Sequence, residues 1–157
     1  MLRAHGVQAL VDVRTIPKSR HNPQYNSDTL ARTLAANGIA YSHAPELGGL
    51  RKPRRDSINL GWRNESFRGY ADYMQTPEFD AAIDALVARS DKQRTAIMCA
   101  EAVPWRCHRS LVADALLARG IEADEIVSET KATPHKLTPC ARVEGTRVTY
   151  PPEGLPL

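Results

Sequence analysis

Two short runs of apolar residues constrain the fold of this chain most. They read ValGlnAlaLeuValAspValArg over residues 7–14 and ThrAlaIleMetCysAla over residues 95–100. Both are too continuously apolar for a strand that has one solvent-exposed face, so they predict buried strands of a parallel sheet. Residues 39–43 and 121–127 predict two further strands. Because the run at 95–100 is the most continuously apolar, we expect it to be the central strand.

Segments with helical spacing of apolar residues alternate with these strands. A helix is predicted over 27–37, and Gly38 provides its stop because glycine tolerates the left-handed backbone at a helix end. Further helices are predicted over 67–74, 77–87 and 107–119. Such alternation predicts an α/β fold with three layers, α/β/α, and a mostly parallel sheet. In such folds ligands bind at the carboxyl ends of the strands.

The length of the chain predicts one domain over residues 1–157, because 157 residues with 42% apolar content are enough for one core. Residues 45–66 are rich in Gly, Arg and Pro and lack periodicity, and we expect this long loop to lie near a functional site. From about residue 133 the chain is rich in proline. This tail is expected to wrap the surface without forming a module.

The chain shows no membrane or secretion signal. No run reaches the roughly 18 apolar residues of a membrane span, and the opening MetLeuArgAlaHisGly lacks the apolar centre of a signal peptide. Three cysteines are too few for a disulfide framework. We therefore predict a cytoplasmic protein of bacterial type with reduced thiols.

Positive charge is concentrated in the first half of the chain. Residues 14–68 hold ten Lys and Arg against four Asp and Glu, whereas the net charge of the whole chain is only +3. The densest part contains Arg51, Lys52, Arg54 and Arg55. This loop is either a solvated basic surface or the contact surface of a nucleic-acid-binding or regulatory module.

Reactive residue types are densest over residues 99–110, which read CysAlaGluAlaValProTrpArgCysHisArgSer. The predicted catalytic residues are Cys99, Glu101, Cys107 and His108, with Arg109 as an anion-binding residue. A thiol at a helix start beside a cation can form a thiolate at neutral pH, and either cysteine fits this role. The alternatives are buried structural cysteines, a helix-capping His108 or Glu101, and an Arg109 held in an ion pair.

Metal and redox sites are weighed against the same residues. Cys99, Cys107, His108 and His43 are acceptable zinc ligands, but the spacing matches no short-spaced zinc pattern. We predict no cofactor and keep a zinc-dependent protein as an alternative. A redox pair of the two cysteines ranks lower, since it lacks the two-residue spacing of common dithiol motifs.

The end of the strand at 7–14 contributes further candidate residues. Asp12, Arg14 and Ser19 are predicted to form an anion-binding crevice with the 99–109 loop, because arginine makes bidentate contacts with phosphate or carboxylate. Gly48 and Gly49 let backbone approach a ligand there or simply turn the chain. Aromatic residues predicted in loops, which can stack on a base or fill gaps, are Tyr25, Trp62 and Trp105.

Taken together these motifs resemble the family called domain of unknown function 488 over nearly the whole chain. The motifs are LeuValAspValArg with a following Pro-x-Ser, ProGluLeuGlyGly, and CysAlaGlu followed by CysHisArgSer. The resemblance implies a fold and a site but no reaction. The matching positions are Asp12, Arg14, Pro17, Ser19, Gly48, Gly49, Tyr70, Cys99, Glu101, Cys107, His108 and Arg109.

Two further points concern related families. Members of the resembled family open with a strand and a ThrIleGlyHisSer-like segment, and this sequence is expected to lack both, since it begins in what reads as a helix end at residues 2–6. The element order is also distantly similar to rhodanese and cysteine-phosphatase domains. The spacing differs, because six residues separate Cys99 from Arg106 where those families have five.

The combination predicts an enzyme, of hydrolase or transferase class, that binds an anionic small molecule resembling a phosphate or a nucleotide. The predicted site is the crevice between Asp12 with Arg14 and the loop from Cys99 to Arg109. The two alternatives are the nucleic-acid-binding module and the metal-dependent protein described above.

Overall fold

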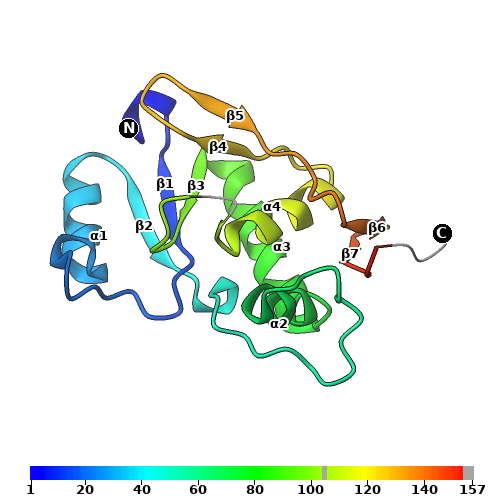
Figure 1. Ribbon diagram of the computed structural model, residues 1–157. Helices are drawn as coiled ribbons and strands as arrows, with labels where there is room; N and C mark the ends of the chain where they lie inside the picture. The colour runs from blue at the N-terminus through cyan, green and yellow to red at the C-terminus, as the bar shows by residue number, and fades with distance from the viewer. Residues whose placement is uncertain (104–105, 154–157) are drawn as a thin grey trace.

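The structure is a computed structural model that describes residues 1–103 and 106–153. Its centre is a parallel sheet of three strands in the order β2-β1-β3 (Figure 1). The register sets Asp12 beside both His43 and Met98. The strands are β1 (Ala9–Asp12), β2 (Ala40–His43) and β3 (Thr95–Met98).

The predicted central position of the run at 95–100 is wrong, because β3 forms an edge of this sheet and β1 its centre. All four residues of β1 are buried, whereas those of β3 are half-buried. Helices cover both faces of the sheet, so an edge strand is as continuously apolar as a central one. A continuous apolar run indicates that both faces of a strand are buried, but it does not indicate where the strand lies in the sheet.

The predicted helices are present, and several of their ends carry capping or stop residues. Asn64 accepts hydrogen bonds from the first turn of α2, and Thr76 caps α3 directly before a proline. Gly38 and Gly120 follow α1 and α4 with φ of +72° and +76°. The helices are α1 (Ser27–Ala36), α2 (Glu65–Tyr73), α3 (Pro77–Lys92) and α4 (Arg109–Ala118), with short 3-10 turns η1 (Arg3–His5), η2 (Pro23–Tyr25) and η3 (Pro45–Leu47).

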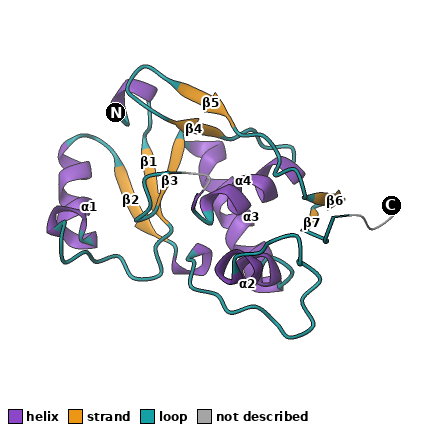
Figure 2. Ribbon diagram, viewed as in Figure 1, coloured by secondary structure: helices purple, strands orange, loops and turns teal. Residues whose placement is uncertain are grey.

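The three predicted layers are confirmed. Figure 2 shows α1 on one side of the sheet and α3 with α4 on the other. On the α1 side, Leu10 packs with Leu30 and Leu34. On the opposite side, Val11 and Val13 belong to the larger core with residues of α2, α3 and α4. Successive residues of β1 therefore face different helical layers.

Residues 121–127 were predicted as a further strand of the main sheet, and this prediction is wrong. The segment contains β4 (Asp124–Ile126), which pairs antiparallel with β5 (Ala132–Pro134) in a separate ribbon. Two of the three residues of β4 are acidic, so the strand does not suit a sheet that is buried on both faces.

The proline-rich tail contributes to the core. A second ribbon joins β6 (Arg142–Glu144) to β7 (Arg147–Thr149), and the following Tyr150 is fully buried. Its hydroxyl donates to Asp114 Oδ2 at 2.7 Å, and its backbone N–H donates to Asn59 Oδ1 at 2.8 Å. The tail is thus packed into the molecule, in addition to crossing its surface. Among the described residues, no helix is long and apolar enough to cross a membrane.

Gly69 allows the long 45–66 loop to pack directly on α2. A Cβ atom at this position would overlap the carbonyl oxygen of Arg51 and lie 2.7 Å from the carbonyl carbon of Lys52. Helix propensity alone predicts that Gly69→Ala stabilises the protein by about 1 kcal/mol. We expect the reverse, a loss of about 1–3 kcal/mol in the free energy of unfolding, because two backbone segments must separate.

Urea denaturation of the Gly69→Ala variant measures this change. Ser66→Ala, at an exposed position of the same helix, is the matched control and should shift the free energy of unfolding by less than about 0.5 kcal/mol. An equal or higher stability of Gly69→Ala would contradict the close approach.

Candidate active site

Residues 99–103 and 106–109 lie at the carboxyl edge of the sheet. The chain leaves β3 after Met98 and enters α4 at Arg109, beside the end of β1. Trp105, one of the predicted loop aromatics, lies outside the described residues. The remaining predicted residues of this segment are described, and they meet around two sulfur atoms.

The two cysteines of this segment are in direct contact. Cys99 Sγ lies 2.6 Å from Cys107 Sγ, and both are free thiols. A covalent S–S bond is about 2.05 Å long, so the two sulfurs are near bonding distance without being bonded. Cys107 is only 4% exposed, whereas Cys99 is half-buried. Cys99 is therefore the more accessible sulfur of the pair, and Cys107 has little exposed surface of its own.

Polar hydrogens converge on the Cys107 sulfur. The backbone N–H and the Nε–H of Arg109 both point at it, at 3.4 and 3.3 Å. The hydrogen bond from the Cys99 thiol, with smaller contributions from His108 and the Arg109 backbone, lowers the pKa of Cys107 well below its ordinary value, although burial opposes this. The same hydrogen bond, together with burial, raises the pKa of Cys99. The donors gathered on Cys107 favour it over Cys99 as the more acidic thiol of the pair.

His108 borders the thiolate. Its Nε2 lies 3.1 Å from the carbonyl oxygen of Val13, which makes Nε2–H the donor and leaves Nδ1 facing Cys107 Sγ at 3.6 Å. The imidazole ring is 5.0 Å from the ring of Tyr70. On its other side, a Cβ on Gly49 would come within 3.2 Å of Nδ1. The ring is held between an aromatic side chain and bare backbone.

The glycine turn at residues 48–49 packs against the protein itself. A Cβ on Gly48 would lie 2.5 Å from Thr15 Oγ1, and that hydroxyl donates to the carbonyl oxygen of Gly49 at 2.9 Å. These two glycines thus let the turn close over the end of β1 and over His108.

Arg109 contacts the backbone of Glu101 and not its carboxylate. The Arg109 guanidinium donates to the carbonyl oxygen of Glu101, and the Glu101 carboxylate accepts from the backbone N–H of Val103 at 3.1 Å. The Glu101 backbone N–H in turn donates to Cys99 Sγ at 3.3 Å. Glu101 is exposed, so its carboxylate is accessible at the rim of the thiol pair.

The other half of the predicted crevice lies on the opposite face of β1. Asp12 is fully buried and accepts bidentate hydrogen bonds from Arg14 at 2.9 and 2.6 Å. Burial opposes ionisation of Asp12, but the hydrogen bonds from Arg14 and Tyr41 outweigh it and lower the pKa of Asp12. Arg14 also donates to the carbonyl oxygen of Tyr25, and Ser19 bonds within its own loop. The structure does not bring these side chains to the sulfurs.

Tyr41, which the sequence did not single out, belongs to this buried network. Its hydroxyl donates to Asp12 Oδ2 at 2.7 Å. Burial and this hydrogen bond raise the pKa of Tyr41 to about 12. The Asp12 carboxylate thus accepts its hydrogen bonds from within the protein, because a buried carboxylate must be paired.

The candidate metal ligands and the basic residues of the 45–66 loop make contacts within the protein. Among residues 1–103 and 106–153, no three His, Cys, Asp or Glu side chains are grouped to hold a metal ion. His43 Nε2 instead lies 2.6 Å from the carbonyl oxygen of Arg14. In the basic loop, Arg51 stacks on Tyr73 at 3.7 Å and Arg54 pairs with Asp56 at 3.0 Å.

Asp114 is a second buried carboxylate that the sequence analysis missed. It is fully buried in α4 and accepts from His135 Nε2 at 2.8 Å, from Tyr150 and from the backbone of Thr138. His135 contacts Glu125 through its other ring nitrogen at 3.1 Å. The signal was present, since Asp114 interrupts the apolar stripe of its helix next to Ala115.

Comparison with known proteins places these residues in a family. The family model described as Domain of unknown function DUF488 matches residues 1–116. This range contains the thiol pair, His108, Arg109 and the glycine turn, and it ends before β4. No curated protein and no solved structure matches the chain. The likeness to rhodanese and phosphatase domains therefore stays a prediction.

Proposed function

The chain belongs to the family described as Domain of unknown function DUF488, and for this member we propose a thiol-dependent oxidoreductase whose nucleophile is the Cys107 thiolate. The observation that carries the proposal is the 2.6 Å contact between Cys99 Sγ and Cys107 Sγ. Two thiols in contact can exchange with a substrate disulfide, because the resolving sulfur is already beside the attacking one.

The reaction follows from the positions of the two sulfurs. The Cys107 thiolate attacks one sulfur of a substrate disulfide, and the other substrate sulfur departs as a thiolate. Once Cys107 is in the mixed disulfide, it no longer accepts the Cys99 hydrogen bond. Cys99 then loses its proton to the departing thiolate and attacks Cys107 Sγ, which releases the second substrate sulfur. Two electrons pass to the substrate, and a thiol reductant restores the protein pair.

The neighbouring groups have distinct roles in this scheme. Arg109 supplies two N–H donors that hold the Cys107 thiolate, and a proton on His108 Nδ1 would add an imidazolium beside it. Glu101 holds Cys99 through its backbone N–H. A cytoplasmic location, as the sequence predicts, agrees with this chemistry because that compartment keeps thiols reduced.

A second candidate uses the same thiolate without redox chemistry. Arg109 at the start of α4 favours an anionic small molecule, of phosphate or nucleotide type, as the substrate of a hydrolase or transferase. Cys107 would attack the substrate, and the exposed Glu101 carboxylate would serve as acid or base. In this second candidate the anion of the substrate contacts Arg109. Arg14, which was also predicted to bind the anion, instead holds the buried Asp12 carboxylate.

Titration with an aromatic disulfide separates the two candidates. All proteins carry Cys140→Ser, so that only the pair reacts. The oxidoreductase is expected to release two equivalents of aromatic thiolate, and Cys99→Ser only one with a stable mixed disulfide. Cys107→Ser should react at less than about a tenth of the wild-type rate, because an ordinary thiol is mostly protonated at neutral pH.

The outcome of the Cys99→Ser reaction decides between the candidates. Two equivalents released from this variant would sink the redox scheme. Full turnover of an anionic ester by Cys99→Ser would support the hydrolase instead. The nucleic-acid alternative keeps its own test, because binding through Lys52 and Arg55 would weaken steeply with salt.

A further inference from the structure

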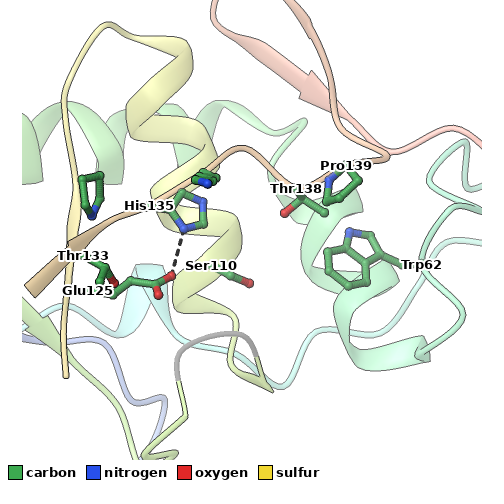
Figure 3. Close-up of a pocket in the computed structure, with 9 residues that line it drawn as sticks. Trp62, Ser110, Glu125, Thr133, His135, Thr138 and Pro139 are labelled. Carbon is green, nitrogen blue, oxygen red and sulfur yellow. Dashed lines mark hydrogen bonds and ion pairs between the residues drawn. The ribbon is translucent and has the colours of Figure 1, made fainter.

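The structure contains a cavity of about 620 Å³ away from the sulfur pair. Its walls include Trp62, Ser110, His135, Lys136, Thr138 and Pro139 (Figure 3). Ligand pockets of small molecules typically measure about 300–1,000 Å³, so the size suits one small molecule. No element of the proposed thiol chemistry uses this cavity.

Two parts of the chain build the walls. Trp62 and Ser110 lie within the family-matched residues 1–116, whereas His135 and its neighbours follow β4 and lie beyond that range. His135 is fixed between Asp114 and Glu125, as the dashed line to Glu125 in Figure 3 indicates. Hydrogen bonds thus anchor this wall to α4, and the cavity is formed in advance of any ligand.

The lining favours a flat, mostly apolar ligand. The indole of Trp62 and the rings of Pro134 and Pro139 present flat apolar surface, and Figure 3 shows the indole on the wall opposite His135. Aromatic rings stack well on such surfaces. The cavity is therefore suited to a planar ring.

Polar groups of the lining add a second requirement. Trp62 Nε1 is buried and has no hydrogen-bond partner among the described residues, so the indole offers its ring surface and not its N–H to a ligand. Lys136 is an exposed ammonium at the same cavity, whereas Glu125 is already paired with His135. The charge available to a ligand is positive.

We propose that this cavity binds a planar aromatic small molecule that carries one anionic group. The ring lies against the Trp62 indole, and the anion pairs with Lys136. Ser110 connects the cavity to the thiol site, because the residue lines the cavity and its hydroxyl donates to the carbonyl oxygen of Cys107 at 2.9 Å. The proposal does not depend on the proposed thiol chemistry.

Titration of the whole protein with 2-naphthoate, followed by amide and indole nuclear magnetic resonance signals, tests the proposal. We expect a saturable shift of the Trp62 indole N–H signal, which is identified by its loss in Trp62→Phe. Lys136→Gln should weaken binding about threefold to fivefold, as for an exposed ion pair. The matched control Lys131→Gln, an exposed lysine that is not part of the lining, should bind as the wild type does.

Two comparison ligands and a filled cavity complete the test. Naphthalene-2-methanol, which lacks the charge, and cyclohexanecarboxylate, which lacks the flat ring, should both bind more weakly. Thr133→Phe places a ring in the cavity and should abolish the shift while the protein stays folded. Unchanged binding by Thr133→Phe, equal binding of the uncharged ring, or no shift of the Trp62 signal would overturn the proposal. Cys107→Ser should bind 2-naphthoate normally, so failure here is separate from failure of the thiol scheme.

Discussion

Alkylation of Cys107 by a small neutral reagent is expected to slow by less than tenfold between pH 8.5 and pH 5.5. A thiol with the ordinary pKa of about 8.5 would lose roughly 500-fold over this range, because only its thiolate reacts. The hydrogen bonds from Cys99 and the Arg109 backbone lower the pKa of Cys107, so its thiolate is expected to persist at acidic pH. Peptide mapping by mass spectrometry identifies which cysteine reacts.

Variants of the neighbours show where this behaviour comes from. Arg109→Gln removes the Nε donor, and Cys99→Ala removes the thiol donor at 2.6 Å. Each should lower the rate at pH 5.5 by about tenfold or more, since one lost charge-assisted hydrogen bond costs about 1.5–3 kcal/mol. Arg106→Gln, at an exposed arginine of the same segment, is the control. A wild-type rate that follows an ordinary thiol titration would contradict the thiolate assignment.

The replacement Asp114→Ala is expected to lower the free energy of unfolding by about 3–5 kcal/mol, which is the range for removing one partner of a buried charge pair. Asp114 accepts from His135, Tyr150 and the backbone of Thr138, and each of these donors would be left unbonded. Most domains are stable by only about 5–15 kcal/mol, so this variant should be severely weakened. Urea denaturation measures it, with the exposed Asp84→Ala of α3 as control.

The loss should also depend on pH. The hydrogen bond to Asp114 raises the pKa of His135, although burial opposes this. A raised pKa in the folded state stabilises the protein fully below the unfolded value of about 6.5, and this stabilisation is lost as pH rises through the folded pKa. The difference between wild type and Asp114→Ala should therefore be larger at pH 6 than at pH 9. A difference below about 1 kcal/mol, or one that is constant with pH, would be inconsistent with the buried pair.

The positions of helices and strands could be predicted from local sequence alone. The apolar spacing of α3, its Thr76 cap and the stops at Gly38 and Gly120 all act within a few residues, and the structure has each of them. The family resemblance is likewise carried by short motifs such as CysAlaGlu and CysHisArgSer, and the family model confirms it over residues 1–116.

The arrangement of the candidate site needed the structure. The prediction grouped Arg14 with the 99–109 segment because both follow strand ends, but alternation along β1 sends Asp12 and Arg14 to the α1 side. The contact between Cys99 and Cys107 depends on where the end of β3 and the start of α4 lie in the fold, and no periodicity describes that. The prediction that residues 121–127 join the main sheet was wrong for a related reason, since strand propensity does not specify which strand a segment pairs with.

By itself the sequence determined the local elements, the cluster of reactive residues over 99–110 and the family to which the chain belongs. Only the tertiary structure decided that β1 is central, that the Cys99 and Cys107 sulfurs are in contact, and that Asp114 and His135 anchor one wall of a cavity. The physical reason is the distance along the chain between the residues that interact. Helix stops and apolar periodicity depend on neighbours in the chain, whereas strand order, sulfur contact and buried charge pairing depend on residues that packing alone brings together.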